Sequence, residues 1–162
     1  MNQKLLNEAG SQLQFVAVFL RKGHVFFHED IESPEFSDKF KVQSFKGVRS
    51  YTVKELEAES SNHFLYDFEY SVGLRAADLG VDEDQDDFLK AEIIATYSVR
   101  YKSDDEVRRE CIEEFLKNNV GYHVWPFWRE HVQSSCMKAG VGLLPVPLYT
   151  DFQKQISTES DD

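Results

Sequence analysis

Histidines are the residues of this chain best suited to acid–base chemistry or metal binding, and there are five of them. His24 and His28 lie four residues apart and are followed by Glu29 and Asp30, so the four could hold a metal ion. They fall in a predicted strand, where a spacing of four puts both rings on one face but some distance apart. We therefore interpret them as exposed strand histidines and expect no metal site.

Other catalytic patterns are absent from the sequence. It has no glycine-rich phosphate loop, no Gly-x-Ser-x-Gly and no Cys-x-x-Cys. The acids between residues 82 and 87 lack the glycine and the spaced glutamate of an EF-hand, so we expect a solvated loop. His123 and His131 are expected to pack or to form hydrogen bonds. We predict no catalytic residue and no cofactor. An enzyme that uses His24, His28 or His123 remains a third hypothesis.

The most informative stretch runs from Trp125 to Val132, Trp-Pro-Phe-Trp-Arg-Glu-His-Val. Proline suits the first turn of a helix, because the N–H that it lacks would be unpaired there. We therefore expect a helix that begins near Pro126 and runs to about residue 138. Trp125, Phe127 and Trp128 are expected to anchor it to the core, although one ring could line a binding groove. Arg129 and Glu130 are expected to form a polar pair.

An apolar segment with two prolines follows this helix. Gly140 and Gly142 supply a helix stop, and residues 141–148 then include Pro145 and Pro147. Such a segment fits neither a helix interior nor a central strand. We expect it to lie extended against the rest of the molecule.

These two segments together resemble the SecB family of export chaperones. In that family a helix opens with Phe-Pro-(Tyr/Phe)-x-x-Arg-Glu or a close variant, followed by glycine, an apolar segment with Leu-Pro-Val, and a last helix. Here the matching residues are Trp125, Pro126, Phe127, Arg129, Glu130, Gly140 and Pro145. The resemblance is firm over about forty C-terminal residues and upstream rests on the order of elements. It implies a four-stranded sheet with two helices, assembled as a dimer of dimers.

The elements that would position these residues follow from periodicity. Alternating or continuous apolar runs predict strands at 14–29, 63–74 and 88–101, and a short half-buried extended segment at 40–45. Residues 53–60 are expected to form a turn or a short helical piece. Helical spacing predicts a helix at 104–118, capped by Asp104 or Asp105, with Gly121 beyond its end. Strands followed by helices favour an α+β fold, an antiparallel four-stranded sheet with two main helices on one face.

Composition limits the class of protein. The 162 residues are 41% hydrophobic and 14% aromatic, enough for one globular domain, which we expect to span residues 1–156 with a disordered acidic tail at 157–162. The net charge of −11 argues against nucleic acid as a partner. The polar start and the short apolar run at 15–20 predict neither a signal peptide nor membrane insertion. Two isolated cysteines fit a reducing compartment, so we expect a cytoplasmic protein.

The resemblance also implies a groove for client polypeptide, between an extended crossover and the last helix. The positions that match are Phe40 and Val42 on the crossover, and Phe152 and Ile156 on the last helix. The two helix positions are four apart, as one apolar stripe requires. The alternative is that all four belong to the core.

One departure separates this chain from the export members of the family. Those members carry acids late in the first strand, in a pattern like Asp-Ile-Ser-Phe-Glu, that help to dock the motor SecA. Here His24 stands in place of the first acid, and only Glu29 or Asp30 could replace the second. The leading hypothesis is an ATP-independent holdase for unfolded polypeptide, including preproteins for export. The alternative is a dedicated chaperone that protects one antitoxin of a toxin–antitoxin system.

Overall fold

The computed structural model describes residues 1–29, 31, 40–57 and 63–149. The elements, in chain order, are α1 (Gln3–Gln12), β1 (Gln14–Phe27), β2 (Phe40–Leu56), β3 (His63–Asp78), β4 (Leu89–Ser103), α2 (Arg109–Asn118) and α3 (Val120–Ala139).

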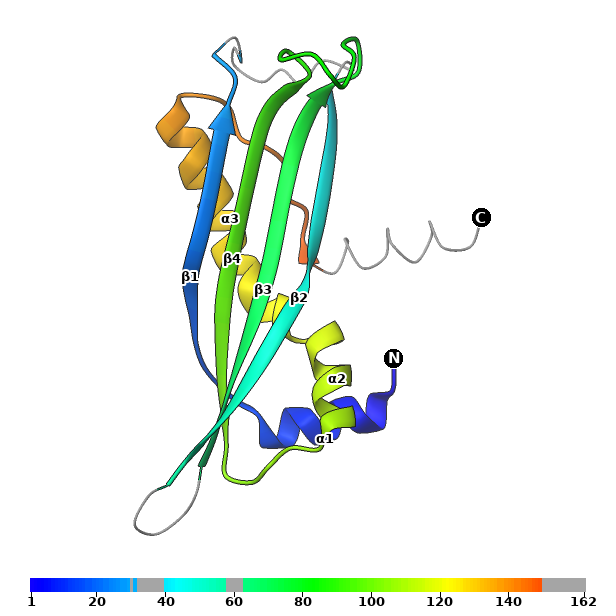
Figure 1. Cartoon of the computed structure of the whole chain (residues 1–162), viewed down its shortest axis with the longest axis vertical. Coiled ribbons are helices and arrows are strands. Elements are labelled where there is room, and N and C mark those ends of the chain that lie inside the picture. Colours follow the sequence, from blue (N-terminus) through cyan, green and yellow to red (C-terminus); the bar gives the residue numbers. More distant parts are fainter. Residues whose placement is uncertain (30, 32–39, 58–62, 150–162) are drawn as a thin grey trace.

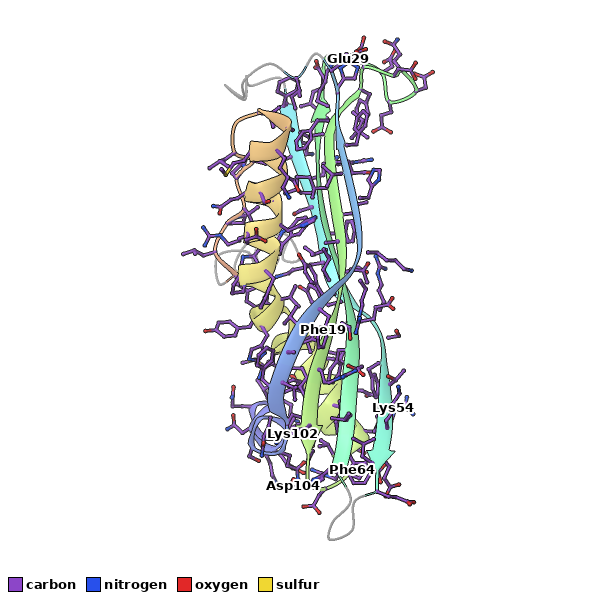
Figure 2. All side chains as sticks on the ribbon, turned by 90° about the vertical axis from the view of Figure 1, so that its left-hand side faces the viewer. Phe19, Glu29, Lys54, Phe64, Lys102 and Asp104 are labelled. Carbon is purple, nitrogen blue, oxygen red and sulfur yellow. The ribbon has the colours of Figure 1, made fainter. Side chains whose placement is uncertain are left out.

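The four strands form one antiparallel sheet in the order β1-β4-β3-β2, so β1 and β2 are its edges. The strands are long, and the sheet is strongly twisted (Figure 1). α3 crosses one face of the sheet, and α1 and α2 lie near one end. Seen from the side, the helices occupy one side of the sheet, and the other side carries side chains alone (Figure 2). The predicted α+β fold, with a four-stranded antiparallel sheet and its helices on one face, is confirmed.

The core lies between the sheet and α2 and α3, and the predicted alternation in the two central strands is confirmed. Rings on β3 and β4 pack on each other and on the one ring of α2: the centroids of Phe68 and Tyr101 are 5.5 Å apart, and those of Tyr101 and Phe115 are 5.1 Å apart. The buried side chains of these strands are Tyr66, Phe68, Tyr70, Val72 and Leu74 on β3, and Ala91, Ile93, Ala95, Tyr97, Val99 and Tyr101 on β4.

The sequence prediction identified no element before residue 14, yet α1 is a helix with a side-chain cap. The side-chain oxygen of Asn2 accepts a hydrogen bond from the backbone N–H of Leu5. Ala9 is fully buried, and the guanidinium of Arg108 donates two hydrogen bonds to the Glu8 carboxylate, at 2.9 and 2.6 Å. Packing against α2 therefore stabilises a segment whose own apolar pattern is sparse.

The edge strand β2 is much longer than predicted. The extended segment expected at 40–45 is confirmed, but the strand continues to Leu56, so the turn or helical piece expected from residue 53 is wrong over residues 53–56. Residues 58–60 of that expected piece lie outside the described residues. A bulge between Val48 and Ser50 interrupts its register with β3. As an edge strand it exposes much of both faces, so its sequence lacks a clear alternation, and pairing with β3 holds it extended.

Both helix starts differ from the prediction. α2 begins at Arg109, and Asp104 does not cap it but lies 3.1 Å from the His63 ring. α3 begins at Val120, so Pro126 lies inside the helix and not in its first turn. Gly121 belongs to α3, where a Cβ would lie within 2.7 Å of the Tyr70 hydroxyl.

The segment after α3 is extended, as predicted. Gly140 ends the helix with φ of 68°, and the N–H of Val141 donates to the carbonyl of Cys136, a left-handed cap that favours glycine. Residues 141–148, named here the proline segment, then run along α3 and β2. Cys111 and Cys136 are free and buried. Among the described residues, every helix is too short or too polar to cross a bilayer.

Candidate polypeptide-binding groove

Trp125 joins α3 to the proline segment. Its side chain is only 5% exposed, so it belongs to the core as predicted. Its indole N–H donates a hydrogen bond of 2.8 Å to the carbonyl oxygen of Pro147. A buried indole that finds a partner for its N–H is a stable anchor. The proline segment is therefore held against α3 from within the core.

Two hollows lie on either side of this anchor. The first has a volume of about 290 Å³ and lies between β2, β3, α3 and the proline segment; its lining includes Val42, Phe45, Leu74, Trp128, Pro145 and Val146. The second has a volume of about 500 Å³ and lies beside the first half of α3; its lining includes Phe15, Tyr122, Phe127, Arg129, Leu148 and Tyr149. Trp125 lines both, and so the two hollows are neighbours on the molecule.

The second hollow is built from rings that meet at oblique angles. The Tyr149 ring lies 5.3 Å from Trp125 and 6.3 Å from Tyr122, both edge to face. Phe15 of β1 stacks on His123 at 4.8 Å, and the hydroxyl of Tyr101 lies 2.8 Å from Nδ1 of the same histidine. Burial lowers the pKa of His123, which favours the neutral form of the ring. This wall of the hollow therefore adds apolar surface without adding charge.

Lys46 places a cation close to this anchor. Its ammonium lies 4.2 Å from the centroid of Tyr149 and 5.3 Å from that of Trp125, within cation–π range. Burial lowers the pKa of Lys46 to about 8. The ring contacts therefore compensate in part for placing an amine beside an apolar groove.

The residues predicted to contact client fall into three groups. Val42 lines the first hollow and is 37% exposed, so it is available to a ligand. Phe40 is the first residue of β2 and is half-buried; it does not line either hollow. Phe152 and Ile156 lie outside the described residues.

The residues of the family motif also differ in their surroundings. Phe127 is 46% exposed and lines the second hollow, so it is not the core anchor that we expected, and Pro145 lines the first hollow. Arg129 lines the second hollow, whereas Glu130 is exposed. Within the described part of the chain these two form no ion pair, because consecutive helix residues point in different directions.

Sequence reasoning missed Tyr122, Leu148 and Tyr149. Tyr122 precedes the expected helix start, and no role was predicted for it. The signal that could have found it is its spacing of three from Trp125, one neighbour step on a helix surface. Leu148 and Tyr149 continue the proline segment, and their role depends on where Trp125 anchors that segment.

His24 on β1 and His28 just after it each lie beside one carboxylate. His24 lies 3.4 Å from Glu92, and His28 lies 3.1 Å from Asp87. No group of three metal-ligating side chains occurs among the described residues. His24 is an exposed strand residue as interpreted, whereas His28 follows the end of β1 and is half-buried.

The arrangement suits recognition of apolar side chains along an extended ligand. The two hollows are lined mainly by carbon, and the backbone of the proline segment lies beside them. Burial of apolar surface stabilises such contacts at about 25 cal/mol per Å². The hollows therefore offer two neighbouring sites for side chains of one bound segment.

Comparison with known proteins identifies the fold. No protein-family model matches the sequence, and no curated protein matches it. The chain is similar in structure to the SecB-like chaperone Rv1957 of Mycobacterium tuberculosis, solved in complex with a ChAD peptide from the antitoxin HigA1. It aligns with a TM-score of 0.65 and 12% sequence identity, over 90% of this chain and 96% of that one. The chain therefore has the fold of a SecB-like chaperone.

Proposed function

We propose that this protein is a chaperone that binds non-native polypeptide in the two hollows beside Trp125. The observation that carries the proposal is the meeting of two apolar hollows at one buried, hydrogen-bonded tryptophan. An extended client segment would place apolar side chains in both hollows. The likeness in fold to a SecB-like chaperone supports the same function.

The mode of action is ATP-independent holding, without enzymatic chemistry. Burial of apolar client side chains supplies the affinity, and the net charge of −11 keeps the complex soluble. Phe40, Phe152 and Ile156 belong to this proposal as further client contacts, added to Val42. The protein acts in the cytoplasm.

A second candidate is a dedicated chaperone for one client, an antitoxin. Two observations favour it. The structure to which the chain is similar in fold was solved with an antitoxin peptide. In addition, His24 stands where the export members carry an acid, and its ring lies beside Glu92. We therefore do not propose SecA as a partner.

Assembly as a homotetramer is part of the proposal. The edge strand β1 exposes Val16, Leu20 and Val25 by 45–51% each, outside the two hollows. α3 exposes Met137 by 74%. An edge strand and a helix with this much exposed apolar surface are typical of protein–protein contacts.

Suppression of aggregation tests the function and the site together. We expect the protein to keep several unrelated, chemically unfolded proteins soluble without ATP, as measured by light scattering. Val42→Ser should weaken client binding about fivefold, because about 1 kcal/mol of apolar burial is lost. Val53→Ser is the matched control: Val53 lies on the same strand, is 42% exposed and lines neither hollow. If both substitutions weaken client binding equally, the assignment of client binding to the hollows is wrong.

The range of clients separates the two candidates. Protection of many unrelated proteins supports the general holdase. Protection of one protein encoded beside this chain, an antitoxin, supports the dedicated chaperone. Protection of none would refute both.

A further inference from the structure

The face of the sheet opposite α3, named here the open face, carries most of the positive charge of the sheet. Cross-strand pairs put the side chains of paired residues on the same face, and so the register assigns each residue to one face. Eight basic side chains belong to the open face, and three acidic side chains do. The eight include Arg21 and Arg49, which lie at bulges and whose guanidinium groups lie over phenylalanines of this face. The bases are Arg21, Lys22, Lys41, Arg49, Lys54, Arg75, Arg100 and Lys102; the acids are Asp67, Glu69 and Glu92.

This excess of five positive charges contrasts with the net charge of −11 of the whole chain. Other acids lie at the sheet ends and on the helices, for example at positions 82–87 and 104–106. The stick view shows Lys54 projecting from the side of the sheet away from α3 (Figure 2). The charge of the molecule is therefore segregated, with a basic open face on an acidic body.

Two of the acids on the open face are already engaged. Arg100 binds Asp67 through two hydrogen bonds of 2.9 Å each, and His24 lies 3.4 Å from Glu92. Lys22 and Lys41 are exposed and form no salt bridge with any described residue, and the same holds for Lys54 and Lys102. The positive charge of the open face is therefore largely uncompensated by the residues that the structure describes.

Aromatic side chains lie among these cations. Phe19, Phe26 and Phe45 belong to the open face and are 36–40% exposed. The guanidinium carbon of Arg21 lies 4.9 Å from the Phe19 centroid, and that of Arg49 lies 5.7 Å from the Phe45 centroid. The open face therefore combines apolar rings with cations held over them.

A glycine fixes the position of one of these rings. A Cβ at Gly73 would overlap the Phe45 ring, so the ring lies directly over the backbone of β3. Beside it is a hollow of about 280 Å³ whose lining includes Gln43, Arg75 and Ile94. The hollow is a place where an apolar side chain could sit next to a guanidinium.

We propose that the open face docks an acidic polypeptide segment of a partner protein, one that carries apolar side chains between its carboxylates. Carboxylates match the uncompensated lysines, and apolar side chains match the rings and the hollow beside Phe45. A nucleic acid is disfavoured by the net charge of −11 and by Asp67, Glu69 and Glu92 on the face itself. α3 and the proline segment lie on the other face, and the two sites meet at Phe45, which lines both the first hollow and the hollow on the open face.

Fluorescence anisotropy with two labelled peptides tests the proposal on the full-length protein. One peptide alternates glutamate with leucine and phenylalanine; the other has lysine in place of each glutamate. We expect only the acidic peptide to bind, with an affinity that falls as salt is raised. The double variant Lys22→Glu/Lys41→Glu should bind it about tenfold more weakly, because two attractions become repulsions.

The matched control is Lys4→Glu/Lys117→Glu, which changes the net charge equally at exposed positions on α1 and α2. It should bind the acidic peptide as the wild type does. Equal losses in the two double variants would overturn the proposal, as would stronger binding of a single-stranded oligonucleotide than of the acidic peptide. Self-association that Lys22→Glu/Lys41→Glu abolishes, with no peptide binding, would assign the face to a second copy and overturn it too. Val42→Ser should leave acidic-peptide binding unchanged, so failure here is distinguishable from failure of the client groove.

Discussion

At the residue scale, Trp125 both packs in the core and holds the proline segment through its hydrogen bond to Pro147. Different substitutions of Trp125 separate these two roles. Trp125→Phe keeps a ring in the core but removes the donor to Pro147. We expect a loss of about 1–2 kcal/mol of stability, from one hydrogen bond and some packing. Client binding should also fall, because the proline segment is no longer held. Trp125→Ala should instead cost about 3–5 kcal/mol, as a large core ring does.

Chemical denaturation and client titration on the same samples check this prediction. Leu143→Ala serves as a control on the proline segment, because Leu143 is 56% exposed and lines neither hollow. A Trp125→Phe variant with wild-type binding and stability would show that the hydrogen bond to Pro147 does not hold the segment.

His131 makes stability depend on pH. Its Nε2 atom is buried without a hydrogen-bond partner among the described residues, and the ring lies against Gly23 of β1. Burial lowers the pKa of His131 below its ordinary value of 6.5, and burial acts in the same direction on His123. Below pH 6.5 these histidines therefore bind protons more readily in the unfolded chain than in the folded chain. The free energy of unfolding consequently falls as the pH falls.

Urea unfolding at pH 7.5 and pH 5.5 measures this effect. The wild type should be less stable at pH 5.5, and His131→Gln should lose less stability than the wild type over the same interval. Some dependence should remain in the variant because His123 still titrates. If the stability of His131→Gln depends on pH as much as that of the wild type, His131 does not contribute to the pH dependence.

Only part of the candidate groove could be predicted from the sequence. Among the residues that line the two hollows, Val42, Trp125 and Pro145 were named from the resemblance to the family. Phe127 was assigned to the core, although it is 46% exposed, because hydrophobicity alone does not say which side of a helix faces the sheet. Tyr149 required knowledge of the hydrogen bond between Trp125 and Pro147, which joins residues 22 positions apart.

At the element scale, Pro126 is the local exception in α3. It lies seven residues into a helix that starts at Val120, so the carbonyl of Tyr122 lacks its helical donor. Packing of this part of the helix offsets the loss, since Val120 and Val124 are fully buried. Pro126→Ala restores the donor, and we expect a gain of about 1–3 kcal/mol in stability.

Thermal or urea unfolding checks this gain, with client binding measured in parallel. Ala139→Pro, at the last residue of the same helix, is the reverse control and should destabilise. If Pro126→Ala is destabilising instead, the proline has a packing role beside the second hollow that exceeds its cost to the helix.

Elements with strong periodicity were predicted well, and elements that depend on partners were not. The central strands β3 and β4 alternate because one face is buried under α2 and α3. β2 has no such pattern, since it is an edge strand, and α1 depends on its contacts with α2. The start of α3 was misplaced because proline favours a first turn in general, whereas here packing of Gly121 against Tyr70 extends the helix backward.

At the scale of the whole molecule, the apolar side chains left exposed on β1 predict assembly. We expect a tetramer by multi-angle light scattering at micromolar concentration. Val16→Lys/Leu20→Lys puts charges on the free edge of β1, where both side chains are about half exposed, and should reduce the oligomer. Val53→Lys, on the opposite edge strand and 42% exposed, is the control and should keep it. A wild-type monomer would contradict the assembly proposal.

The central claim is that the hollows beside Trp125 hold non-native polypeptide. A photo-crosslinking amino acid placed at position 42 or at position 148 tests it most directly, with the same amino acid at position 53 as control. Val42, Leu148 and Val53 are all partly exposed, but only the first two line a hollow. We predict that an unfolded polypeptide crosslinks to positions 42 and 148 and not to position 53. Equal crosslinking at all three positions, or none at 42 and 148, would contradict the account.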